Sequence, residues 1–81
     1  MWYVYILECR DKTLYTGITK NIEQRLEQHN SGKASKYTRG RVPVKLVYKE
    51  KQLNQSSALK REVQIKQLTR EKKFILIKPA V

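Results

Sequence analysis

The 81-residue chain contains one cysteine, one histidine, one aspartate, three glycines and two prolines. A lone Cys9 cannot form an internal disulfide or a cysteine-based zinc site, and it is typical of a reducing compartment. One histidine excludes a two-histidine ribonuclease site and a His-x-x-x-His zinc site. Because Asp11 lies in a predicted turn, a Ser-His-Asp triad would need a glutamate in its place. The sequence also lacks a glycine-rich phosphate loop before a helix.

The sequence also lacks a signal peptide and any apolar run near the roughly 20 residues that a membrane span needs. We therefore expect a cytoplasmic protein with no membrane association. Its length predicts one small domain over residues 1–81, with one modest core. The sequence does not indicate an oligomeric state.

Positive charge is abundant and unevenly distributed. Lys and Arg total 18 against 7 acidic residues, which gives a net charge of +11. Residues 1–32 hold four basic and four acidic residues, whereas residues 33–81 hold fourteen and three. This asymmetry favours binding to a polyanion, and nucleic acid over ribosomes or anionic membrane.

The segment from Tyr3 to Gly17 predicts an antiparallel hairpin, because two runs of aromatic and β-branched residues flank a polar turn. We expect a loop at 9–11, with Tyr5 opposite Tyr15 and Tyr3 opposite Gly17. This register places two phenols side by side, next to a glycine where a ligand's backbone could approach. Core packing of the aromatics is the alternative.

A first helix is predicted from Ile22 to His29 or Asn30, with Asn21 or Thr19 as its N-cap. Ile22, Leu26 and His29 share one face, and Arg25 lies at its edge. A histidine on an apolar face is usually a satisfied core residue. The charge of an arginine at the edge, however, needs a partner.

Residues 31–41 predict a basic loop that grips phosphate and carries a stacking aromatic, with a solvated linker as the alternative. The expected nucleic-acid contacts there are Lys33, Lys36, Tyr37, Arg39 and Arg41. A third strand is predicted at 44–49, with Val44, Leu46 and Tyr48 on one face.

A long helix is predicted from about Ser56 to Arg70, with Ala58, Leu59, Val63, Ile65 and Leu68 forming an apolar face. Glu62 falls in the middle of that face, and a carboxylate there needs a cation. An ion pair with Arg25, Arg61 or a lysine and a metal site are both open interpretations. Residues 74–77 could form a strand or a last helical turn before Pro79.

One carboxylate, one arginine, one imidazole and two phenols on a basic protein are sufficient for phosphodiester hydrolysis with one divalent cation. The cation would neutralise phosphate charge, Arg25 would stabilise the developing anion, and a phenol or imidazole would take a proton from water.

Taken together, the motif residues resemble the GIY-YIG nuclease domain over nearly the whole chain, and most closely its small standalone bacterial members. The matching positions are Tyr5, Tyr15, Gly17, Arg25, His29 and Glu62. Tyr3 and Thr16 replace the glycine and isoleucine of the signatures. Residues 63–81 lack the asparagine found after the glutamate helix in several relatives, and Ile18 replaces a lysine, for which Lys20 or Lys36 could substitute.

The resemblance implies an α+β fold, a three-stranded antiparallel sheet flanked by helices with the active site on one sheet face. It also implies a DNA endonuclease with Tyr5, Tyr15, Arg25 and His29 as catalytic groups. A water would attack, Mg²⁺ or Mn²⁺ would bind Glu62, and Tyr5 or His29 would accept the proton. Repair or recombination is the expected setting. The alternative is a non-catalytic nucleic-acid-binding module that keeps the fold.

Overall fold

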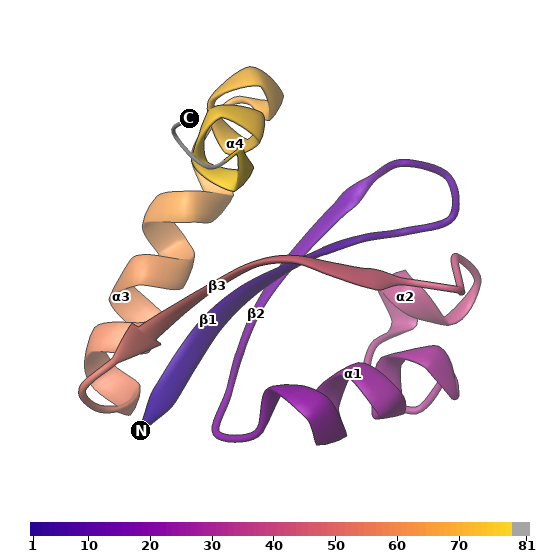
Figure 1. Ribbon diagram of the computed structural model, residues 1–81, viewed down its shortest axis with the longest axis horizontal. Helices are drawn as coiled ribbons and strands as arrows, with labels where there is room; N and C mark the ends of the chain where they lie inside the picture. The colour runs from indigo at the N-terminus through magenta and orange to yellow at the C-terminus, as the bar shows by residue number, and fades with distance from the viewer. Residues whose placement is uncertain (79–81) are drawn as a thin grey trace.

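The computed structural model describes residues 1–78, so Pro79 lies outside the described residues. The fold is α+β, with a three-stranded antiparallel sheet in the order β2-β1-β3 and helices on both faces, as expected from the sequence (Figure 1). The elements are β1 (Trp2–Glu8), β2 (Leu14–Thr19), α1 (Ile22–Asn30), α2 (Lys36–Arg39), β3 (Lys45–Gln52), α3 (Gln55–Lys66) and α4 (Arg70–Ile77).

Alternate residues of the central strand β1 enter two separate cores. Val4 and Ile6 are buried with Ala58 and Ile65 of α3, and residues of α4 pack on the same cluster. We call this side of the sheet the α3 face. Tyr5 and Leu7 point the opposite way and are buried against α1, and this side is the α1 face. The two cores allow a single strand to position groups from both halves of the chain.

The hairpin forms, but its predicted register is wrong by two residues. Tyr5 lies opposite Gly17, and Leu7 lies opposite Tyr15. The reason is that the turn lies one residue further along the chain, at residues 10–12, where a hydrogen bond of 2.9 Å from the Cys9 amide to the Thr13 carbonyl closes it. Lys12 takes a left-handed conformation there with φ of 71°, as the last residue of a three-residue loop often does.

The third strand contains a bulge that makes its predicted face assignment wrong. Tyr48 pairs with Ile6, whereas Leu46 pairs with Leu7, so Val47 is the extra residue. Leu46 therefore packs on the α1 face, and Tyr48 packs on the α3 face. A bulge adds one residue to one strand and reverses the alternation beyond it.

The first helix matches its predicted bounds, and the Asn21 side chain caps it by accepting the Gln24 amide at 3.0 Å. The predicted basic loop at 31–41 instead contains α2, whose N-cap is Ser35.

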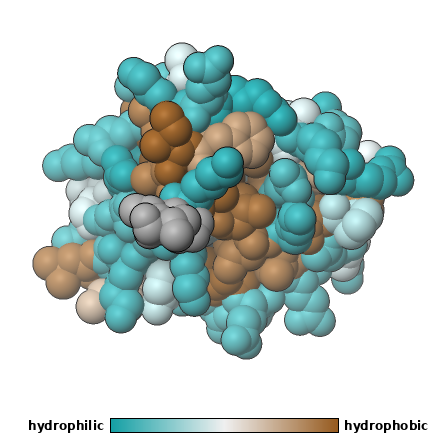
Figure 2. Space-filling view, turned by 45° about the horizontal axis from the view of Figure 1, so that its top comes forward, coloured by the Kyte–Doolittle hydropathy of each residue, from teal (hydrophilic) through white to brown (hydrophobic). Residues whose placement is uncertain are grey.

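The helix predicted from about Ser56 to Arg70 is shorter than expected, and a separate helix follows it. Here α3 ends at Lys66, and Thr69 caps α4, which includes the segment 74–77. Leu59 and Val63, predicted on the apolar face, are 45% and 52% exposed, because the contact of α3 with the sheet is narrower than its apolar arc. Figure 2 shows hydrophobic side chains gathered near the middle of one face of the molecule, with hydrophilic side chains around them. No helix among residues 1–78 is long and apolar enough to cross a membrane.

Candidate active site

Gly17 provides space for the ring of Tyr5. A Cβ atom at Gly17 would lie 2.6 Å from the Tyr5 hydroxyl oxygen and 2.7 Å from the carbon that bears it. Both distances are far below van der Waals contact, so any larger residue would displace the phenol. The expected opening for a ligand's backbone beside this glycine is therefore filled by the protein's own tyrosine.

A buried hydrogen-bonded chain runs from Tyr5 through His29 to Thr38. The Tyr5 hydroxyl lies 2.8 Å from Nε2 of His29, and Nδ1 of His29 lies 2.8 Å from the Thr38 hydroxyl. Tyr5 is only 2% exposed, and His29 and Thr38 are not exposed at all. His29 is a satisfied core histidine that can reach a substrate only through Tyr5.

Burial, and secondly the positive charge of Arg25, lower the pKa of His29 to about 4. The imidazole is therefore neutral near pH 7, with one nitrogen protonated and the other free to accept a hydrogen bond. Burial also raises the pKa of the Tyr5 hydroxyl, against the opposing effect of the Arg25 guanidinium beside it. Tyr5 is thus a neutral phenol in the free protein, and a group must take its proton before it can act as a base.

Arg25 supplies positive charge to this site, and no carboxylate in the described part of the chain forms an ion pair with it. One terminal nitrogen of its guanidinium donates to Gln28 Oε1 at 3.0 Å. Its Nε is buried and has no hydrogen-bond partner among residues 1–78. A buried guanidinium donor without a partner is costly and suits an incoming anion such as phosphate.

Tyr15 joins the buried chain to the basic segment that follows α1. Its ring meets His29 edge-on at 5.1 Å between centroids and stacks on Tyr37 at 5.9 Å. The Arg41 guanidinium lies 4.1 Å from the centre of the Tyr37 ring and pairs with Asp11 at 3.1 Å. Tyr37 is therefore held by neighbours within the protein while 38% of its surface stays exposed.

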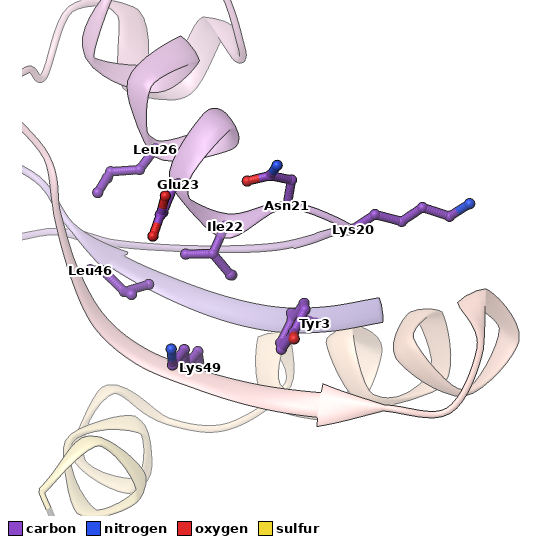
Figure 3. Close-up of a pocket in the computed structure, with 8 residues that line it drawn as sticks. All are labelled: Tyr3, Lys20, Asn21, Ile22, Glu23, Leu26, Leu46 and Lys49. Carbon is purple, nitrogen blue, oxygen red and sulfur yellow. The ribbon is translucent and has the colours of Figure 1, made fainter. Parts of the chain in front are cut away.

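The other predicted contact residues lie at the surface. Lys33, Lys36 and Arg39 are exposed around α2. Lys20 lies 5.5 Å from the centre of the Trp2 ring and borders a hollow of about 410 Å³ between α1 and the sheet (Figure 3). Tyr3, Glu23 and Lys49 also line this hollow, which Tyr5 and His29 do not reach. The hollow is lined by side chains of both charges, and none of the candidate catalytic groups lines it.

Glu62 lies on α3, which covers the opposite side of the sheet from α1, so its helix does not share the sheet face of Tyr5 and His29 that the resemblance implied for the active site. It lies on α3 between the buried residues Ala58 and Ile65, and its side chain is 17% exposed. Its negative charge is the smallest of the causes that act on the raised pKa of Tyr5. Its ion-pair partner is Lys66, at 3.6 Å. Arg61 instead pairs with Glu50.

Among residues 1–78, no group of three or more His, Cys, Asp and Glu side chains could hold a metal ion. A single carboxylate still fits Mg²⁺, which is commonly bound through one or two carboxylates, with waters and substrate phosphates completing its shell. Glu62 is largely buried, and its one ion-pair partner is a half-exposed lysine with 53% side-chain exposure. Its oxygens therefore fit a hard divalent cation.

The buried chain Tyr5–His29–Thr38, together with Arg25 and Glu62, supplies the polar and charged groups of a candidate site on a small α+β fold. The GIY-YIG catalytic domain matches residues 1–74, and the chain belongs to this family. Members of this family generally use a divalent metal, and the domain implies nucleic-acid binding.

Relatives over nearly the full length carry the name UPF0213 protein. The relative from Syntrophus aciditrophicus is 62% identical over 77 residues, which cover 94% of this chain and 88% of that protein. The relative from Oceanobacillus iheyensis is 55% identical, with 93% and 87% covered. The solution structure of the UPF0213 protein from Bacillus halodurans matches with a TM-score of 0.60 and 45% identity, covering 95% of this chain and 83% of that chain.

Thr38 was not identified from the sequence, although it lies in the buried chain. A threonine in a basic loop carries no periodic signal. The one local hint is Ser35, whose side chain accepts the Tyr37 amide at 3.1 Å and so begins the helical turn that turns Thr38 inward.

Proposed function

We propose that this protein is a metal-dependent endonuclease that hydrolyses phosphodiester bonds in DNA. The observation that carries the proposal is Arg25, a partly buried guanidinium that has no carboxylate partner within residues 1–78 and lies beside the hydroxyl of Tyr5. An arginine with a purely structural role would be expected to pair with an acidic side chain when it is buried to this extent. A scissile phosphate would supply the missing negative charge.

The protein's own residues suit hydrolysis by an activated water. Tyr5 would take a proton from the water and pass its own proton to Nε2 of His29, 2.8 Å away. A phosphate bound at Arg25 would cancel one of the two causes of the low His29 pKa, and so would ease this transfer. Tyr15 lies at 6.5 Å from Tyr5 between ring centroids, and we assign it to contact with the phosphate.

A divalent cation, Mg²⁺ or Mn²⁺, would be held by Glu62 and would neutralise charge on the phosphate as the bond to the leaving oxygen breaks. The exposed basic residues around α2 would hold the flanking phosphates and carry little sequence information. We therefore expect recognition of DNA shape, such as branched or single-stranded forms, and a role in repair or recombination.

The test is cleavage of supercoiled plasmid and of synthetic flaps and junctions by the full chain with Mg²⁺ or Mn²⁺. Arg25→Ala and Glu62→Gln should each lower the rate by about 10²–10³-fold, the range seen when one transition-state donor is removed. Arg10→Ala and Glu71→Gln, at exposed positions, are the matched controls and should cleave normally. EDTA should abolish cleavage.

The second candidate is a nucleic-acid-binding module without turnover. It is favoured by the near-complete burial of Tyr5 and by the ion pair that already satisfies Glu62. DNA binding that survives both site substitutions, without cleavage of any substrate by the unchanged protein, would establish this reading and reject the endonuclease.

A further inference from the structure

The direction of the buried hydrogen-bonded chain can be derived from the groups at its two ends. A guanidinium has only donors, and Arg25 lies beside the Tyr5 oxygen and lowers the pKa of that phenol. The Tyr5 oxygen therefore faces a donor on one side, and its own proton must point elsewhere. The group in hydrogen-bond range is Nε2 of His29, at 2.8 Å.

A neutral imidazole that accepts at Nε2 must carry its proton on Nδ1. That Nδ1 proton points at the Thr38 hydroxyl oxygen, 2.8 Å away. The hydroxyl of Thr38 then accepts with a lone pair, and its own proton must find another acceptor. The backbone carbonyl of Ser35, which can only accept, lies 3.4 Å away. Each proton of the chain from the Tyr5 hydroxyl to the Ser35 carbonyl thus has an acceptor, in one direction.

We propose that Thr38 is a positioning residue, whose hydroxyl holds His29 in the Nδ1-protonated tautomer so that Nε2 accepts the proton of Tyr5. The reversed tautomer would place an N–H against the Tyr5 hydroxyl and would leave no acceptor for the Tyr5 proton. It would also close the route by which Tyr5 loses that proton. In this arrangement the four-residue helix α2 positions Thr38 beside the His29 imidazole, with the Thr38 side chain fully buried.

The catalytic consequence of this proposal rests on the proposed endonuclease activity. When Tyr5 takes a proton from the attacking water, an O–H bond of the water breaks and a new O–H bond forms on the Tyr5 oxygen, while the original O–H bond of the phenol breaks and a new N–H bond forms at His29 Nε2. The imidazole becomes an imidazolium, whose Nδ1–H remains hydrogen-bonded to Thr38. No electron is transferred, and no reactant other than the water is needed.

The experiment uses the chain's single histidine, because ¹⁵N-histidine labelling then yields one imidazole. At pH 7 the unchanged protein should show Nδ1 protonated and Nε2 as a hydrogen-bond acceptor. Thr38→Val removes the hydroxyl at nearly constant shape and should shift His29 toward the Nε2-protonated tautomer. Thr38→Ser keeps a hydroxyl and should restore the original signals. Thr16→Val, at a buried threonine on the α3 face, is the matched control and should not change them.

Cleavage provides a second readout. Thr38→Val should lower the rate by about 10–100-fold, as the loss of a group that orients a histidine does elsewhere, and Thr38→Ser should recover most of it. Nε2 protonation in the unchanged protein, or an unaltered tautomer in Thr38→Val, would overturn the assignment whether or not the protein cleaves DNA. A tautomer that responds as expected, in a protein without cleavage, would uphold Thr38 and reject the endonuclease instead.

Discussion

Acidification should destabilise this protein through His29, well above the pH at which carboxylates titrate. The imidazole is fully buried, and burial with the nearby charge of Arg25 lowers its pKa to about 4 in the folded state. In the unfolded chain the pKa of histidine is about 6.5. Between these two values the unfolded state binds a proton that the folded state does not bind, so stability falls as the pH falls.

The size of this loss follows from the difference in pKa. Each pH unit below about 6.5 costs about 1.4 kcal/mol, which is about 2 kcal/mol at pH 5 and about 3 kcal/mol at pH 4. Other groups add little to the upper part of this window. The pKa values of Asp11 and Glu50 are lowered by their partners, so their own contributions are lost only at lower pH.

Urea unfolding followed by circular dichroism at several pH values from 7.5 to 5 measures the effect directly. The free energy of unfolding should be level down to about pH 6.5 and then fall with a slope approaching one proton. His29→Gln, whose amide can both donate and accept, is the matched control and should lack the slope between pH 6.5 and 5. An unchanged stability of the original protein over this range, or an equal slope in the variant, would refute the buried neutral imidazole.

Two further predictions test the packing and the charge of the site. Gly17→Ala should displace the Tyr5 ring and destabilise the fold by about 1–3 kcal/mol. The control variant Gly40→Ala, with no atom within 4 Å of its added Cβ, should have a melting temperature close to that of the unchanged protein. Equal melting temperatures of the two variants would contradict the close approach of Gly17 and Tyr5. Replacing Lys33, Lys36 and Arg39 by alanine should reduce the slope of log K against log salt for duplex DNA by roughly 2 to 3. The same change at Lys60, Lys72 and Lys78 should have a smaller effect, and equal effects would place the contact elsewhere.

The sequence predicted the elements whose signals are periodic and local. Residues 22–30 combine a capping asparagine with an apolar stripe, and the structure contains that helix with the same bounds. The two strands of the hairpin were likewise evident from their aromatic and β-branched residues. Such patterns predict helices and strands well, because burial of one face repeats the same spacing of apolar residues along the whole element.

The errors fell where the chain changes direction without glycine or proline. Lys12 adopts a left-handed conformation that is usually associated with glycine or asparagine, so the position of the turn was misjudged by one residue. The break between α3 and α4 at 67–69 likewise has neither residue. Four-residue α2 is too short for a periodic signal, and therefore Thr38 was missed.

The prediction that Tyr5, Tyr15 and Gly17 share one sheet face is correct although the predicted register is wrong, for a simple geometric reason. Side chains alternate with a period of two, so a slip of two residues moves each pairing along the strand but leaves every side chain on its face. A change of one residue, as at the Val47 bulge, reverses the faces. None of the candidate catalytic groups comes from β3, so that error did not affect the predicted site. A sequence-based site prediction in a sheet thus depends on whether a register error is even or odd, and on which strands carry the site.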